Sequence, residues 1–175
     1  PTAFREVFGQ TGTLELSEAE MALANEAAIT KVVVEGQIDQ VLNVKSKSAL
    51  KEFVSLIKGF KLPPDLLKQA RKLKLHEPKI IKNVEQLQTV LSSPDWRNMP
   101  QLVDTPAPSQ IFGQIAHAAG IEAILYRSVK GKKDCLAVFV ENFQNSNSFV
   151  ELEGAIPKAT KLARLDSASW QDFAR

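Results

Sequence analysis

Short segments of apolar residues, spaced at either the strand or the helix period, run along most of the chain. Alternating apolar and polar residues indicate a half-buried strand, whereas apolar residues three or four positions apart indicate one face of a helix. The first part of the chain is therefore predicted to form strands over 3–8, 13–16, 30–36 and 40–44, and helices over 18–28, from Ser46 or Ser48 to near Gly59, over 64–73 and over 84–91.

The most informative stretch is 107–143, where a helix, a tight turn and two strands follow one another. Ser109 is predicted to cap a helix over 110–119, and Gly120 to end it in the left-handed conformation. The first strand, 121–126, ends in the polar residues Tyr126, Arg127 and Ser128 where an apolar run would continue. The loop KGKKD then joins it to a strand over 135–142, and a last strand is predicted over 148–154.

Strands and helices alternate irregularly, and several strand pairs are close enough to form hairpins. This order predicts an α+β fold in a single domain, with small mixed or antiparallel sheets and flanking helices, rather than a doubly wound parallel sheet. We expect the domain to span residues 1–155. The polar tail 156–175 is expected to pack on it, with Trp170 and Phe173 as anchors.

Composition narrows the functional classes. Hydrophobic residues make up 44% of the chain and charged residues 24%, and the net charge is only +2, which is typical of a soluble globular protein and does not require nucleic acid as a partner. Cys135 has no second cysteine to pair with, so a reducing cytoplasm is the expected compartment. The only histidines, His76 and His117, lie far apart, and no zinc-site spacing or membrane-spanning run is present.

Two side chains stand out as candidates for chemistry. Glu26 lies near the end of a helix that is otherwise apolar or small, so its carboxylate faces either a cleft or, as a plain amphipathic helix would have it, solvent. Glu18 and Glu20 compete with it, but they suit the first turn of the helix. Ser128 is either a ligand-binding residue at a strand end or simply the polar end of that strand.

Other polar features favour simpler interpretations. The segment 58–82 is rich in lysine but has no interleaved aromatic residues, so a solvated helix face or a patch for an acidic partner is preferred over a nucleic-acid surface. Binding of DNA or RNA through this segment stays open as a third hypothesis. His117 is interpreted as a packing or surface residue, and Cys135 as an inert thiol.

Four segments, in order, resemble the RES family of bacterial NAD-consuming toxins, named for arginine, glutamate and serine. They are TLELSEAEMALANEA, VVVEGQIDQVLNV, SQIFGQIAHAAGIEAILYRS and LAVFVENF. The first is similar to the family's strand and Ala-Leu-rich helix that carries its glutamate, here Glu26. The third is similar to the helix, glycine turn and strand that end in the family's Tyr-x-Ser, here Tyr126 and Ser128.

The resemblance implies an ADP-ribosyltransferase-like fold that cleaves the nicotinamide–ribose bond of NAD by phosphorolysis, hydrolysis or ADP-ribosyl transfer. It implies Glu26 and Ser128 as catalytic residues, and Arg5, Tyr126 and Ser128 as NAD-binding residues, with no metal. Ala3 stands where the family has arginine and Glu15 where it has tyrosine, so a module that binds NAD or a partner without turnover is the alternative. The implied partner is a helix-turn-helix type antitoxin, and a homo-oligomer is left open.

Overall fold

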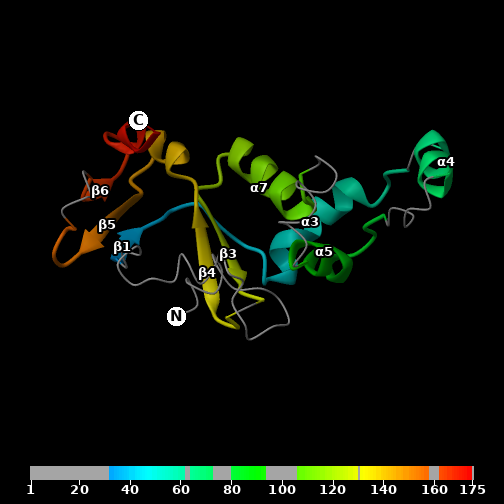
Figure 1. The fold of residues 1–175 in the computed structure, drawn as a ribbon, viewed down its shortest axis with the longest axis horizontal. Helices are drawn as coiled ribbons and strands as arrows, with labels where there is room; N and C mark the ends of the chain where they lie inside the picture. The colour runs from blue at the N-terminus through cyan, green and yellow to red at the C-terminus, as the bar shows by residue number, and fades with distance from the viewer. Residues whose placement is uncertain are drawn as a thin grey trace, which may run out of the picture. The chain divides into compact units, whose positions relative to one another are not determined.

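The computed structural model describes residues 32–61, 64–72, 80–93, 106–129, 131–157 and 162–174 (Figure 1). These residues form helices and two three-stranded sheets, one mixed and one antiparallel, which confirms the predicted α+β class. Contacts divide the chain into two compact units: unit 1, residues 1–43 and 110–175, and unit 2, residues 44–109. The elements predicted over 3–8, 13–16 and 18–28 lie outside the described residues.

Unit 2 contains the helices α3 (Lys47–Ile57), α4 (Pro64–Lys72) and α5 (Val84–Leu91). Helix α3 packs against α5, and the buried residues of the pair are Leu50, Val54 and Leu87. Their spacing places Leu50 and Val54 one turn apart on the same face of α3. The three helices agree with the sequence prediction to within a few residues at each end.

The caps of these helices differ from expectation. Ser46 occupies the N-cap position of α3, but its side chain makes no capping hydrogen bond, because its hydroxyl is paired with that of Ser48 at 2.8 Å. At α5 the side chain of Asn83 accepts a hydrogen bond from the backbone N–H of Gln86 at 2.9 Å. The effective cap in unit 2 is therefore an asparagine at α5 rather than a serine at α3.

Unit 1 contains a mixed sheet of β2 (Val41–Asn43), β3 (Ala123–Arg127) and β4 (Asp134–Val138), in that order. Strand β2 runs parallel to β3, and β3 pairs with β4 as the predicted antiparallel hairpin. The second strand of this hairpin was predicted to run to residue 142, which is wrong: the chain turns at Phe139 into a 3₁₀ helix, η3 (Val140–Asn145).

The side chain of Asn142 accounts for this turn. Its amide donates hydrogen bonds to the carbonyls of His117 and Ile121 at 2.8 and 2.7 Å, and Val140 and Phe143 of the same 3₁₀ helix are buried. Residues three apart lie on one side of such a helix, so both apolar side chains point inward together. An extended strand would direct them to opposite faces and leave one exposed.

The second sheet of unit 1 is antiparallel, with the order β1 (Val33–Gln37), β5 (Phe149–Glu153) and β6 (Arg164–Leu165). Strands β1 and β5 match the sequence prediction closely. Strand β6 and the 3₁₀ helix η4 (Trp170–Ala174) were not predicted, because the polar tail shows no apolar alternation. Instead, the guanidinium of Arg164 lies 3.8 Å from the ring centre of Phe149 and pairs with Glu151 and Asp166.

Helix α7 (Pro108–Ala118) directly precedes strand β3 in the chain. Its predicted start at a Ser109 cap is wrong by two residues, because Pro108, whose fixed φ suits the first turn, already belongs to the helix. Gly120 follows the helix with φ +81°, as predicted for a residue that ends a helix in the left-handed conformation. None of the helices in the described ranges has both the length and the apolar character needed to cross a lipid bilayer.

Candidate functional site

At the C-terminal end of strand β3, two of the predicted site residues, Tyr126 and Ser128, lie on one face of the mixed sheet. Side chains alternate along a strand, so Ile124, Tyr126 and Ser128 project to the same side. The register pairs Tyr126 with Cys135 on β4, so Cys135 lies on that side as well. Tyr126 is half-buried, whereas Ser128 is only 2% exposed.

Ser128 is held rigidly where β3 meets the hairpin loop. Its backbone N–H donates to the carbonyl of Lys133 at 2.8 Å, and its carbonyl accepts from the N–H of Lys132 at 3.0 Å. Its hydroxyl oxygen accepts a hydrogen bond from the N–H of Gly131 at 2.6 Å. Lys132 adopts a left-handed φ of 55°, which closes the turn tightly.

Among the described residues, the hydroxyl of Ser128 has one hydrogen-bond partner, the N–H of Gly131. A serine hydroxyl carries one donor and two acceptor positions, and the contact with Gly131 uses an acceptor. Within the described part of the chain no acceptor lies within hydrogen-bond distance of this proton. Buried polar groups are nearly always paired, so the acceptor of this proton lies either in a part of the chain outside the described residues or in a bound molecule.

The opposite end of β3 carries a buried carboxylate that sequence analysis missed. Glu122 is 1% exposed. Its Oε2 accepts hydrogen bonds from the backbone N–H groups of Asp39 and Gln40 at 3.0 and 2.8 Å and from the hydroxyl of Ser148 at 2.7 Å. The sequence signal was a lone glutamate between Ile121 and Ala123, inside an apolar run and two residues after Gly120.

The charge of Glu122 is stabilised by this cage. Burial raises the pKa of its carboxyl, but hydrogen bonding by Ser146, the Gln40 amide, Ser148 and the Asp39 amide outweighs burial, and the net pKa lies below its ordinary value. The carboxylate therefore ties the β1–β2 connection and the residue before β5 to the start of β3. Its hydrogen bonds serve the fold, and it is not suited to exchange protons near neutral pH.

The remaining candidates are distributed as follows. Arg5 and Glu26 lie outside the described residues, as do Ala3 and Glu15. The ring of His117 packs edge-on against Phe139 at 5.3 Å, and its Nε2 lies 3.9 Å from Oε2 of Glu141, which agrees with a packing or surface role. Among the described residues, no group of three or more histidine, cysteine, aspartate or glutamate side chains is arranged to hold a metal ion.

The comparison with protein families decides which family this arrangement represents. The model described as the RES domain matches residues 46–153, which is more than half of the 175-residue chain. The chain belongs to the RES family. Within this RES chain, the matched region includes Tyr126, Ser128 and Glu122 and spans parts of both compact units. No curated protein and no solved structure matches the chain.

Proposed function

We propose that this RES chain consumes NAD by cleaving the bond between nicotinamide and ribose, as the toxin component of a bacterial toxin–antitoxin pair. One observation carries the proposal: the buried hydroxyl of Ser128, whose proton has no acceptor among the described residues, lies directly after β3 and two residues from Tyr126 within the RES-matched region. A donor fixed in this way is suited to a polar substrate such as NAD, whose ribose and carboxamide oxygens accept hydrogen bonds.

The proposed reaction breaks one bond and forms one bond at C1′ of the nicotinamide ribose. Nicotinamide leaves with the electron pair of the glycosidic bond, and positive charge develops on the ribose ring. An acceptor (water, phosphate or a protein side chain) then adds to C1′ and loses its proton. Groups that stabilise the developing charge contribute most of such a rate enhancement.

Each candidate residue has a proposed role in this scheme. The Ser128 hydroxyl donates to the carboxamide or ribose of NAD and so orients the leaving nicotinamide, with Tyr126 beside it. The carboxylate of Glu26 stabilises the positive charge on the ribose electrostatically. Arg5 binds the pyrophosphate, because a guanidinium donates two parallel hydrogen bonds to paired oxygens.

The family resemblance supports the wider context of this proposal. Uncontrolled loss of NAD would harm the cell that makes the enzyme, so we propose a cytoplasmic antitoxin of the helix-turn-helix type that covers the substrate site. The protection would be reversible, because removal of the antitoxin restores access to Ser128. Co-expression with the neighbouring reading frame, followed by co-purification, tests this part of the proposal.

The enzymatic proposal is tested by following nicotinamide release from NAD, with and without phosphate, for the wild type, Ser128→Ala and Glu26→Ala. We expect release by the wild type, and a loss of about 10- to 100-fold in Ser128→Ala, because a hydrogen bond that strengthens with developing charge is removed. Phosphate dependence of the release would identify phosphate as the acceptor. Ser148→Ala is the matched control, since it removes a buried serine hydroxyl from the Glu122 cage instead.

Two results would overturn the proposal. One is the absence of nicotinamide release by folded wild-type protein freed of any co-purifying partner. The other is release that Ser128→Ala and Ser148→Ala reduce equally, because this would indicate a general loss of fold rather than a contact with the substrate.

A further inference from the structure

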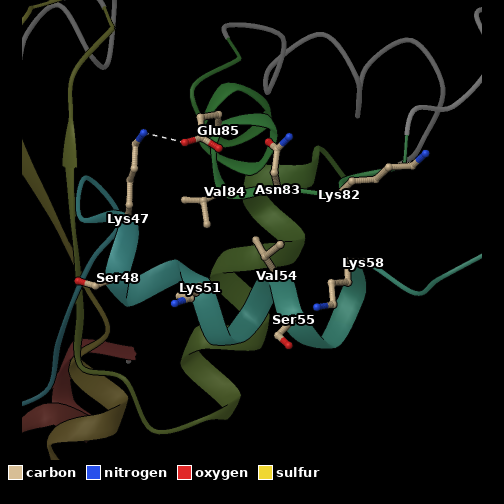
Figure 2. A pocket seen from close by; sticks show the side chains of 10 residues that line it. All are labelled: Lys47, Ser48, Lys51, Val54, Ser55, Lys58, Lys82, Asn83, Val84 and Glu85. Carbon is tan, nitrogen blue, oxygen red and sulfur yellow. Dashed lines mark hydrogen bonds and ion pairs between the residues drawn. The ribbon is translucent and has the colours of Figure 1, made fainter.

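A groove of about 420 Å³ lies along α3 and the N-terminal end of α5 (Figure 2). All the residues that line it belong to unit 2, and none has a role in the proposed cleavage of NAD. Four lysines surround the groove, namely Lys47, Lys51, Lys58 and Lys82, against the single carboxylate of Glu85. Its most marked property is therefore a concentration of positive charge.

Most of this charge is not neutralised by the residues that the structure describes. Lys47 forms an ion pair with Glu85, with 2.6 Å between Nζ and Oε1, and this pair occupies the one acidic residue of the groove. No carboxylate in the described part of the chain pairs with the side chain of Lys51, Lys58 or Lys82. Within the described ranges, three ammonium groups around one groove thus have no acidic partner and attract an anionic ligand.

Unit 2 as a whole also carries an excess of positive charge. Residues 44–109 contain 12 basic and 6 acidic side chains, a net charge of +6, whereas the rest of the chain contains 10 basic and 14 acidic side chains, a net charge of −4. The near-zero total of +2 conceals this asymmetry. Unit 2 therefore attracts acidic partners over a distance of about one Debye length, roughly 8–10 Å at moderate salt.

The lining of the groove favours a peptide over a nucleic acid. Val84, which is half-buried, provides apolar surface between the lysines (Figure 2), and Ser48, Ser55 and Asn83 provide hydrogen-bonding groups. No aromatic residue lines the groove, so the base stacking that anchors single-stranded nucleic acids is missing. From Lys47 to Lys58 the helix extends roughly 16 Å, about the length of five extended residues.

We propose that this groove binds a short acidic segment of a partner protein in an extended conformation. Its carboxylates pair with Lys51, Lys58 and Lys82, and one apolar side chain of the segment lies against Val84. The proposal is independent of the NAD chemistry, since it uses a different set of residues in the other compact unit.

The test uses the full chain and a fluorescein-labelled peptide of ten residues, in which glutamates flank a central pair of leucines. Fluorescence anisotropy measures its affinity at low and moderate salt. Lys51→Glu/Lys58→Glu is expected to weaken binding by at least about 10-fold, because each reversal replaces an attraction with a repulsion. The matched control Lys68→Glu/Lys72→Glu makes the same charge change on α4, outside the groove, and is expected to retain most of the affinity.

Three further measurements sharpen the result. Replacing the central leucines of the peptide with serines is expected to weaken binding about 5-fold, through the loss of buried apolar surface. Circular dichroism of both variants verifies their fold. Nicotinamide release in the same variants is expected to be unchanged, so failure of the peptide proposal and failure of the enzymatic proposal are distinguishable.

The proposal is overturned if the peptide shows no saturable binding, or if both double variants weaken binding equally, which would indicate a general charge effect. It is also overturned if a single-stranded oligothymidine of twenty nucleotides binds more tightly than the peptide and loses affinity only in the groove variant. That outcome would assign the groove to nucleic acid instead.

Discussion

The two ends of strand β3 both carry a buried polar side chain, but the two side chains use their hydrogen bonds differently. At one end, the carboxylate of Glu122 accepts from two backbone amides and from Ser148. At the other end, the hydroxyl of Ser128 accepts from Gly131, and its own proton meets no acceptor in the described part of the chain. Both residues are at most 2% exposed.

On the proposed function, this difference separates a structural role for Glu122 from a substrate-binding role for Ser128. A buried carboxylate that accepts three hydrogen bonds from the protein, as Glu122 does through Oε2, stabilises the fold. A buried group that is fixed but incompletely paired is instead suited to bind a ligand, because its remaining donor is desolvated before the ligand arrives. Burial alone would have ranked Glu122 and Ser128 together, whereas their partners distinguish them.

The largest expected effect on stability is at the Glu122 end. Glu122→Ala would leave the amide of Gln40 and the hydroxyl of Ser148 without this acceptor, and the amide of Asp39 with only the Ser148 hydroxyl oxygen at 2.9 Å, in a site with little access to water. We expect a loss of about 3 kcal/mol or more in the free energy of unfolding. Urea denaturation followed by circular dichroism measures it, and a loss below about 1 kcal/mol would show that water replaces the carboxylate.

The second largest expected effect is a contrast between the variants Ser128→Ala and Ser148→Ala. Ser128→Ala is expected to reduce nicotinamide release about 10- to 100-fold while the free energy of unfolding falls by only about 1 kcal/mol, since one acceptor for Gly131 is lost. Ser148→Ala is expected to reduce stability by about 1–2 kcal/mol and to leave the specific activity of the folded fraction unchanged. Parallel denaturation and activity measurements test both. The comparison of the two strand ends fails if the two variants behave alike.

The pH dependence of stability is expected to show a smaller effect. The folded-state pKa of Glu122 lies below its ordinary value of 4.5, so the unfolded state binds more protons and stability rises with pH in this range. The contribution is complete above about pH 4.5 and is lost as the pH falls through the folded-state pKa. The wild type should therefore lose its stability advantage over Glu122→Gln as the pH falls from about 6 toward about 3, the range in which a carboxyl group titrates.

The difference in the free energy of unfolding between wild type and Glu122→Gln isolates the contribution of Glu122 from that of the other carboxylates. The pKa of Asp166 is lowered to about 2, chiefly by its hydrogen bond with Arg164, and Asp166 titrates equally in both proteins. A difference that stays constant from neutral pH to below pH 4 would contradict the lowered pKa of Glu122.

Much of the fold was predictable from local sequence signals. The helices α3 and α5 follow from apolar residues at helical spacing, and the β3–β4 hairpin follows from two apolar runs around a polar loop. The end of β4 was not predictable, because Val140 and Phe143 continue the apolar run and only the tertiary contacts of Asn142 turn it into a 3₁₀ helix. Strand β6 was missed because long-range pairing with β5 gives it its conformation.

The candidate site was predictable to a different degree. Ser128 was found because a polar residue at the end of an apolar strand is visible in the sequence. Glu122 was missed because its partners at Asp39, Gln40 and Ser148 come from segments 26 to 83 residues away. Neither the lysine groove nor its charge balance was resolved by the sequence, which showed only a basic segment over 58–82.

The smallest expected effect comes from a carboxylate that is also hydrogen-bonded but exposed. The Lys47–Glu85 pair is short, but its side chains are 66% and 60% exposed, and exposed pairs contribute little because water and salt screen them. Lys47→Met should leave the midpoint of thermal unfolding unchanged within error. The hydrogen bond from Lys47 is the main reason why the pKa of Glu85 is lowered, so the same variant should raise that pKa in an NMR titration. A clear drop in the unfolding midpoint of Lys47→Met would contradict this expectation. It would show that an exposed hydrogen-bonded carboxylate can stabilise this fold as a buried one does.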